Sequence, residues 1–402
     1  MIEVQAAEDL VRRHFTKTSK QKVSLDRLAG RILACPLQAP REQPPFDRVA
    51  MDGIAVCFNG YFPKIYKIEG MQKAGHPPKT LRQIENAIEV MTGAVLPNGS
   101  DTVIPYEYVS IHNQIATLKK EYVPKKGDNI HFQGSDHPQG KTLLNTGVKL
   151  TSPSVALIAG QGYREAVVYK YPKIAIVSTG DELIDPGEKC ENWQIWRSNS
   201  YGIYSELSSL GYSDSDIASF HVGDDQIKIF NLLSDLLQSY RILILSGGVS
   251  MGKYDFVHTV MNDLGVKKIF HKIKQKPGKP MYFGVGADNQ NIFGLPGNPV
   301  SALICMRRYI ISGLEAVLGR PVHQYNAVLN QEIKFKKDFS LFKAVVVKSD
   351  DDGRLMADPI SSNGSGDFST LGGSDGFLQL PSNKTIYKKG EVYPYFPWTR
   401  IS

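Results

Sequence analysis

The sequence contains few cysteines and no long apolar run. Its four cysteines stand far apart, without a C-x-x-C pair or a cysteine–histidine spacing that binds zinc, so we expect free thiols in a reducing compartment. No apolar stretch approaches the roughly 18 residues of a membrane helix. The acidic, amphipathic first residues resemble neither a secretory signal nor an anchor. We therefore expect a cytoplasmic protein with no membrane contact.

Common nucleotide motifs and a strong charge bias are also missing. Neither the P-loop pattern G-x-x-x-x-G-K-[ST] nor the dinucleotide pattern G-x-G-x-x-G occurs, which argues against the common ATPase and dehydrogenase classes. Lys and Arg number 47 against 40 Asp and Glu, and this net charge of +7 favours anionic ligands in general. The lysines are dispersed rather than gathered in a basic stripe, so we expect no nucleic-acid partner.

The middle of the chain, from about 172 to 319, has the pattern of an α/β domain. Three short apolar runs, 174–177, 242–245 and 291–294, are typical of strands covered on both faces. Helices are expected between and after them, at 200–210, 225–237, 254–264 and 300–318. Alternation of this kind predicts right-handed crossovers and a mostly parallel sheet.

The regions on either side of this domain have different sequence patterns. Apolar residues recur every three or four positions from 4 to 15, which predicts an amphipathic helix, and a second short helix is expected at 152–158. From about 55 to 144, and again after 321, β-branched and aromatic runs are broken by Gly, Pro and Asn. A length of 402 residues suits about two to three domains, so the chain is predicted to be a multidomain α/β plus β protein.

Ligands of a doubly wound sheet bind beyond the carboxyl ends of its strands. The residues that follow the three apolar runs are small, polar or acidic and form a predicted substrate site: Ser178, Thr179, Gly180, Asp181 and Glu182, then Ser246, Gly247, Gly248 and Ser250, then Pro296, Gly297, Asn298, Pro299 and Ser301. The glycine-rich loop lets backbone N–H groups approach a phosphate, although a simple tight turn is the alternative.

Charged residues near the same edge suit an anionic substrate. Five carboxylates are expected there, each of which is otherwise an ordinary helix cap or a solvated side chain: Asp181, Glu182, Asp224, Asp225 and Asp255. Several carboxylates beside a phosphate require a cation such as Mg²⁺. Lys276 and Lys279 stand in a stiff Pro- and Gly-containing loop, which is either a solvated basic turn or an oxyanion site.

Six motifs in this order carry a resemblance to a known family. They are PPFDRVAMDG, TGAVLPNGSDTV, STGDEL, SGGVSMGKYD, KPGKP and LPGNPVSA, and the similarity runs from about residue 43 to the C-terminal NGSGDFSTLGGSDGFLQLP. Together they resemble the molybdopterin molybdenumtransferases, the MoeA-type enzymes of molybdenum cofactor biosynthesis. Each motif alone is weak, but six in register are specific.

The resemblance implies an architecture and an activity. It suggests a homodimer with four parts per chain: a segmented linking domain (1–45 and 142–171), a β-rich insert (46–141), a three-layer α/β/α molybdopterin-binding domain (172–320) and a C-terminal β-barrel (321–402). The implied reaction inserts molybdate into adenylylated molybdopterin and releases AMP. The molybdopterin adenylyltransferase is a suggested partner.

Residue roles follow from the same resemblance. Catalytic roles are expected for Asp52, Thr92, Glu182, Asp224 and Asp255, and a Mg²⁺ site for Asp181, Asp224 and Asp255. Pro296 and Pro299 match the paired prolines of the last motif, and Lys276, Lys279 and Ser301 are expected to hold molybdate. In the implied mechanism Mg²⁺ polarises the phosphoanhydride while the lysines position the oxoanion.

Two departures and two rival functions remain open at this point. Arg48 and Val49 stand where the family often has Asn-Ser, and Arg197 replaces a usual acidic residue, which leaves a tungstate-preferring enzyme conceivable. The α/β part alone also suits a molybdopterin adenylyltransferase, although the flanking β regions argue against it. A non-catalytic dimeric scaffold of the same fold is the other alternative.

Overall fold

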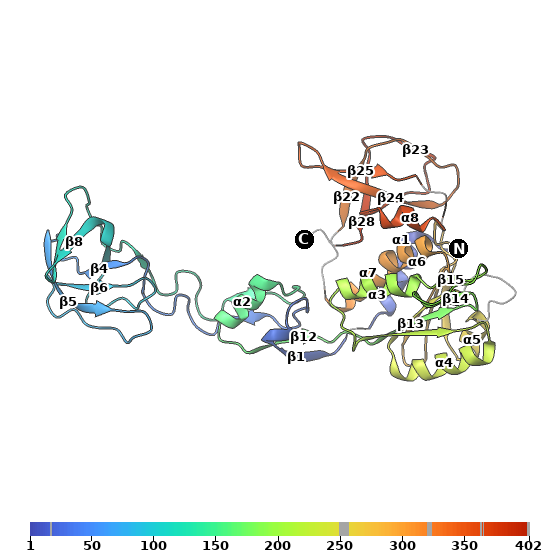
Figure 1. Cartoon of the computed structure of the whole chain (residues 1–402), viewed down its shortest axis with the longest axis horizontal. Helices are drawn as coiled ribbons and strands as arrows, with labels where there is room; N and C mark the ends of the chain where they lie inside the picture. The colour runs from blue at the N-terminus through green and yellow to red at the C-terminus, as the bar shows by residue number, and fades with distance from the viewer. Residues whose placement is uncertain (17, 249–256, 320–323, 362–363, 365, 400–402) are drawn as a thin grey trace. The chain divides into compact units, whose positions relative to one another are not determined.

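The computed structural model describes residues 1–16, 18–248, 257–319, 324–361, 364 and 366–399. The chain divides into two compact units (Figure 1). The small unit is Pro36–Asn145 with Ala156–Arg164, and the large unit is Met1–Cys35, Thr146–Val155 and Glu165–Ser402. Because two units do not separate four parts, the boundaries expected from the sequence stay predictions.

The centre of the large unit is a six-stranded sheet. Its strands stand in the order β16 (Ile217–Val222), β13 (Ile174–Thr179), β17 (Ile242–Ser246), β21 (Asn291–Leu295), β20 (Tyr282–Val285) and β18 (Lys267–His271). The first four are parallel, and β20 and β18 join antiparallel at one edge. The mostly parallel sheet predicted from the apolar runs is therefore confirmed.

Helices cover both faces of this sheet because successive strand residues point to opposite sides. Ile174 and Ile176 of β13 belong to one core, shared with α3 (Asn199–Ser209). Ala175 and Val177 belong to the other, shared with α4 (Gln226–Ser239) and α5 (Val257–Asp263). Figure 1 shows α4 and α5 on one side of β13 and α3, α6 and α7 on the other.

The helix expected at 300–318 is helical but not uniform. It begins as α6 (Pro299–Cys305), passes through a π-helical turn at Met306–Ile310 and ends as α7 (Ile311–Val317). The predicted N-terminal helix is confirmed as α1 (Val4–His14), and the short helix after residue 151 as α2 (Ser152–Gly160). Val4, Ala7 and Val11 of α1 pack into the core that contains α7.

The C-terminal part of the large unit is a closed barrel. Its five strands follow one another as β24 (Ser340–Ser349), β25 (Leu355–Pro359), β22 (Tyr325–Leu329), β28 (Val392–Pro397) and β26 (Gly376–Leu380), and β26 pairs again with β24. A sixth strand, β19 (Gln275–Lys276), comes from the α/β part and pairs parallel to β24. The barrel is thereby joined to the loop that carries the two predicted site lysines.

The small unit is β-rich, as its pattern of β-branched and aromatic runs predicts. A sheet runs β7 (Thr102–Pro105), β4 (Gly53–Val56), β6 (Ala87–Val90), β5 (Ile65–Gln72), β9 (Ile115–Leu118) and β8 (Val109–His112). Ile54 and Val56 face one small core and Ala55 faces another, so this sheet is also covered on both sides.

Across the part of the chain that the structure describes, no helix has the length and apolarity required to cross a membrane.

A buried ionic network joins α1 to the π-helical turn. Arg308 Nη1 lies 2.6 Å from Glu8 Oε2, and the two side chains are 4% and 10% exposed. Ser312 Oγ donates to Glu8 Oε1 at 2.7 Å. Burial opposes ionisation of Glu8, but the charge and hydrogen bond of Arg308, with the Ser312 hydroxyl and the charge of Arg12, lower its pKa below the usual value. The ion pair therefore holds α1 on the core.

Replacing Glu8 by Ala leaves the Arg308 guanidinium buried without its carboxylate, so we expect a loss of about 3–5 kcal/mol in the free energy of unfolding. The neighbouring Asp9 accepts a bond from the exposed Gln5 amide at 3.1 Å, and Asp9→Ala should cost about 0.5 kcal/mol or less. Because the folded pKa of Glu8 is lowered, its contribution is complete above about pH 4.3 and is lost as the pH falls through the folded pKa. Urea unfolding measures both variants, and equal losses would contradict the assignment.

Candidate functional site

Three strands of the central sheet end in line, and their following loops share one cavity. The register pairs Ser178 with Ser246 and Ser246 with Leu295, so the loops start side by side. The cavity, called here the strand-end cavity, has a volume of about 610 Å³. It brings together most of the predicted substrate and catalytic residues of the α/β part: Ser178, Thr179, Gly180, Glu182, Asp224, Ser246, Gly247, Gly248, Pro296, Gly297, Asn298 and Pro299.

Three of the four glycines that line this cavity among the described residues have a conformation that side chains rarely adopt. Gly180, Gly247 and Gly248 have φ angles of 138°, 97° and 66°. A Cβ atom on Gly247 would lie 2.6 Å from the carbonyl oxygen of Thr179. The loop therefore requires glycine, which leaves its backbone open to a ligand.

Asn199, at the start of α3, ties two of the loops together and was not predicted. Its Nδ2 donates to Ser246 Oγ at 2.7 Å and to the Gly297 carbonyl at 2.8 Å. Among the described residues, Asn199 Oδ1 and Thr179 Oγ1 are buried without a hydrogen-bond partner. Buried polar atoms of this kind usually find a partner, so both suit contact with a ligand. Spacing in the sequence gave no signal for Asn199, because it lies in a helix that is separated from the strand ends by a two-stranded parallel ribbon.

Two of the predicted metal ligands adjoin one another: Asp224 lines the strand-end cavity, and Asp181, which is not among its lining residues, bonds to it. Asp181 Oδ1 accepts the backbone N–H of Asp224 at 3.1 Å, and both side chains are exposed. Within the described ranges, no group of three His, Cys, Asp or Glu side chains is arranged to hold a metal ion. Asp255 and Ser250 lie outside the described residues. Two carboxylates with phosphate oxygens are a donor set that suits Mg²⁺.

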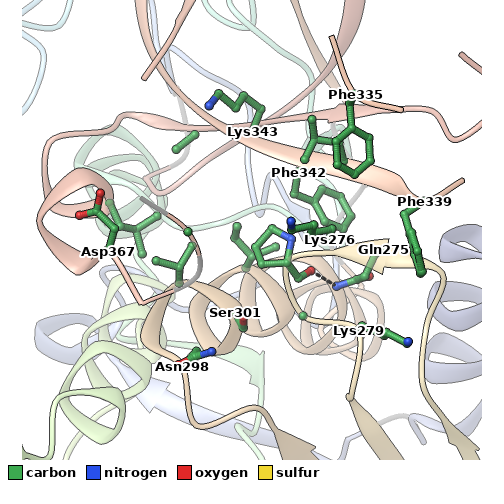
Figure 2. Close-up of a pocket in the computed structure, with 18 of the residues that line it drawn as sticks. Gln275, Lys276, Lys279, Asn298, Ser301, Phe335, Phe339, Phe342, Lys343 and Asp367 are labelled. Atoms are coloured by element: carbon green, nitrogen blue, oxygen red, sulfur yellow. Dashed lines mark hydrogen bonds between the residues drawn. The ribbon is translucent and has the colours of Figure 1, made fainter. Parts of the chain in front are cut away.

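The predicted lysines line a second cavity of about 610 Å³, called here the lysine cavity. Lys276, Lys279 and Ser301 contribute from the α/β part. Figure 2 shows Asn298 and Ser301 from the start of α6 on one side and barrel side chains on the other. The barrel adds lysines and aromatic rings that the sequence did not identify as site residues: Lys334, Lys337, Lys343, Phe335, Phe339 and Phe342.

The charge of the lysine cavity is strongly positive. Five lysines line it, and Asp367 is the one carboxylate among the described lining residues. Burial lowers the pKa of Lys343, because desolvation disfavours the ammonium form. A bound oxoanion would oppose that shift. The sequence did not identify Lys343 as a site residue. Alternation along β24 predicts which of its side chains share a face, but it does not predict that β24 lies beside Lys276 and Lys279.

The loop of Lys276 and Lys279 is held by a buried side chain. Gln275 is 1% exposed, its Nε2 donates to the Pro277 carbonyl at 3.0 Å, and the Tyr309 hydroxyl donates to its Oε1. Gly278 has a φ of 87°, and a Cβ atom there would lie 2.5 Å from Cys305 Sγ. The lysines therefore project from a loop that is clamped on α6 and the π-helical turn.

Asp52 and Thr92 lie in the small unit and bond to each other. Asp52 Oδ1 accepts the Thr92 N–H at 2.6 Å and the Thr92 hydroxyl at 2.8 Å. These two bonds lower the pKa of the exposed Asp52 carboxyl, so it stays ionised. The structure brings this predicted pair together within the small unit.

Both departures from the family pattern have partners within their own unit. Arg197 pairs with the Asp185 carboxylate, and its guanidinium carbon lies 5.7 Å from the centre of the Tyr201 ring. Arg48 Nη2 lies 2.8 Å from His131 Nδ1. Arg197 therefore does not bring an unpaired positive charge to the strand-end cavity.

Comparison with known proteins gives consistent matches along the chain. Residues 2–162 match the family described as MoeA N-terminal region (domain I and II), 175–316 the probable molybdopterin binding domain, and 326–398 the MoeA C-terminal region (domain IV). The molybdopterin molybdenumtransferase of Synechocystis is 37% identical over 99% of this chain and all of its own length. That of Haemophilus influenzae is 30% identical over 96% and 95%.

A solved structure agrees with the fold. The molybdopterin biosynthesis MoeA protein of Pyrococcus horikoshii superposes with a TM-score of 0.80 at 25% identity, over 99% of this chain and all of that one.

The clamped lysine loop can be tested by adding one methyl group. Gly278→Ala must accept both a positive φ and the contact with Cys305, so we expect a loss of about 2–4 kcal/mol in unfolding free energy. Gly390→Ala has the same backbone strain at φ 88°, with nothing within 4 Å of the new atom, and should cost about 1–2 kcal/mol. Denaturant unfolding compares them, and hydrogen exchange should rise in the lysine loop of the first variant alone. Equal losses in unfolding free energy for the two variants would show that the new methyl group does not clash with Cys305.

The chain matches the MoeA N-terminal, molybdopterin-binding and MoeA C-terminal regions in order, and it carries glycine loops at the strand ends, adjoining carboxylates and a lysine cavity. It therefore belongs to the MoeA family of molybdenum cofactor biosynthesis proteins.

Proposed function

We propose that this protein is a molybdopterin molybdenumtransferase, which transfers molybdenum from molybdate to adenylylated molybdopterin and releases AMP. One observation carries the proposal: the two cavities share Pro280, Pro296 and Asn298 as lining residues, so they are contiguous. A glycine-lined pocket for a diphosphate therefore adjoins a lysine-lined pocket for an oxoanion. Relatives that match nearly the whole chain carry this activity in their names.

Each cavity suits one part of the reaction. The open backbone at Gly247 and Gly248 suits phosphate oxygens, which accept hydrogen bonds from N–H groups. Molybdate is a tetrahedral dianion, and Lys276 and Lys279 supply charge while the buried Ser301 hydroxyl supplies a donor. Holding both groups side by side replaces a bimolecular encounter by reaction within one complex. No covalent protein nucleophile is required.

Asp181 and Asp224 suit Mg²⁺, with Asp255 as the expected third ligand. When bound, the ion would neutralise the phosphoanhydride and favour its cleavage. Glu182 lies close enough to Gly180 that a Cβ atom there would meet its carboxylate at 2.5 Å, so this side chain folds over the loop. We further propose that Asp52, oriented by Thr92, acts in the reaction, as the resemblance implies.

We also propose that the protein is a cytoplasmic homodimer that receives its substrate from the molybdopterin adenylyltransferase. These statements follow from the family resemblance. Sedimentation of the purified chain measures the oligomeric state, and a binding assay with the adenylyltransferase measures the proposed partnership.

The function is tested by the release of AMP from adenylylated molybdopterin in the presence of molybdate and Mg²⁺. We expect the double variant Lys276→Gln and Lys279→Gln to raise the KM for molybdate by at least roughly tenfold, since two charge-assisted contacts are lost. Lys348→Gln is the matched control, because this exposed lysine lies on β24 outside the lysine cavity. Release of pyrophosphate from ATP would instead identify an adenylyltransferase, and no turnover of either kind would identify a scaffold.

The metal site is tested with two adjacent carboxylates. Asp224→Asn should raise the Mg²⁺ concentration for half-maximal activity by roughly tenfold, because a ligand charge is lost. Asp225 caps α4 by accepting the N–H groups of Ile227 and Lys228, and asparagine caps equally well. Asp225→Asn is therefore expected to leave the Mg²⁺ dependence unchanged, and an equal effect of both substitutions would refute the assignment. Removal of Mg²⁺ by a chelator should stop turnover.

A further inference from the structure

A half-exposed tryptophan lines the strand-end cavity and has no role in the reaction described above. Trp196 ends β15 (Ile195–Trp196), which pairs with β14 (Leu183–Ile184) in a short ribbon between β13 and α3. Its side chain is 55% exposed, although tryptophan usually hides most of its surface. Its place on the cavity lining therefore needs an explanation.

The indole ring is fixed by its polar edge. Trp196 Nε1 donates to the carbonyl oxygen of Glu188 at 3.2 Å, and the backbone is held by pairing with Ile184. That bond uses the single donor of the side chain. The exposed remainder of the ring offers π and dispersion contacts, which suit a planar ring better than a charged group.

The charges around Trp196 make the strand-end cavity a poorer site for free molybdate than the lysine cavity. Arg197 is the one cation among the described residues that line the strand-end cavity, and it is paired with Asp185. Glu182 and Asp224 add negative charge there, while five lysines line the other cavity. Molybdate and the dithiolene that receives its metal therefore belong at the lysine end.

The chemistry of the substrate then orients it. In adenylylated molybdopterin the dithiolene and the phosphate-bearing carbon are attached to the same pyran ring, and the adenosine follows the diphosphate. With the dithiolene at the lysine end and the diphosphate at the glycine loops, the adenosine extends away from the lysines. Trp196 lines the strand-end cavity and is not among the residues that this cavity shares with the lysine cavity.

We propose that Trp196 stacks on the adenine ring of the adenylyl group. This inference rests on the proposed function, and it adds the residue that recognises the leaving group. Stacking of a base on an aromatic side chain needs no hydrogen bond to the base. Trp196 thus holds AMP in the substrate and in the product.

The test is the binding of AMP, which calorimetry measures without any metal transfer. We expect Trp196→Ala to weaken AMP binding by roughly tenfold and Trp196→Phe by a smaller factor, because phenylalanine retains a smaller ring. Trp193→Ala is the matched control: this side chain is 69% exposed and belongs to the same connection, but it is not among the residues that line the cavity. Ribose 5-phosphate, which lacks the base, should bind the protein and Trp196→Ala equally.

A stacked base should also quench tryptophan emission, and Trp196→Phe should remove that quenching. Equal AMP affinity of Trp196→Ala and the unaltered protein would overturn the proposal, as would an equal loss for ribose 5-phosphate or no AMP binding by the unaltered protein. The proposed function fails separately. If AMP binding depends on Trp196 but no molybdate-dependent turnover is found, the transferase function is rejected and the stacking is kept. If turnover is found and Trp196→Ala leaves the KM for adenylylated molybdopterin unchanged, the stacking is rejected.

Discussion

Parallel pairing of β13, β17 and β21 is the constraint on which the site depends. Parallel strands in register must end together, and here the register sets Ser178, Ser246 and Leu295 side by side. Each strand is buried at every position, so polar groups that can reach a ligand come in the loops beyond the carboxyl ends of the strands. Loops far apart in the chain therefore converge on one cavity.

Charge separation along the joined cavities gives the site a direction. Carboxylates gather where the glycine loops suit a diphosphate, and lysines gather where the barrel approaches. The carboxylates attract a cation to the strand-end cavity, and the lysines attract an oxoanion to the lysine cavity. In the proposed function, the substrate would span the two cavities in one orientation, with metal transfer at the lysine end and release of the nucleotide at the other end.

The barrel contributes more than a separate β domain would. Pairing of β19 with β24 fixes the backbone at Gln275 and Lys276, while Tyr309 and Cys305 hold the same loop from the helical side. A long flexible lysine is then presented from a rigid base, which lowers the entropy lost when it binds an anion. The buried Glu8–Arg308 pair steadies the π-helical turn behind this loop.

The sequence by itself determined the three neighbouring parallel strands β13, β17 and β21, most helices, and the small and acidic residues that follow these strands. Those features are local, because apolar periodicity and glycine or proline positions act within a few residues. Tertiary structure alone decided that β19 joins the barrel, that Lys343 and Phe342 line the lysine cavity, and that Asn199 ties Ser246 to Gly297. Backbone pairing and packing between distant segments leave no periodic mark in either segment, so these contacts appear when the chain is folded.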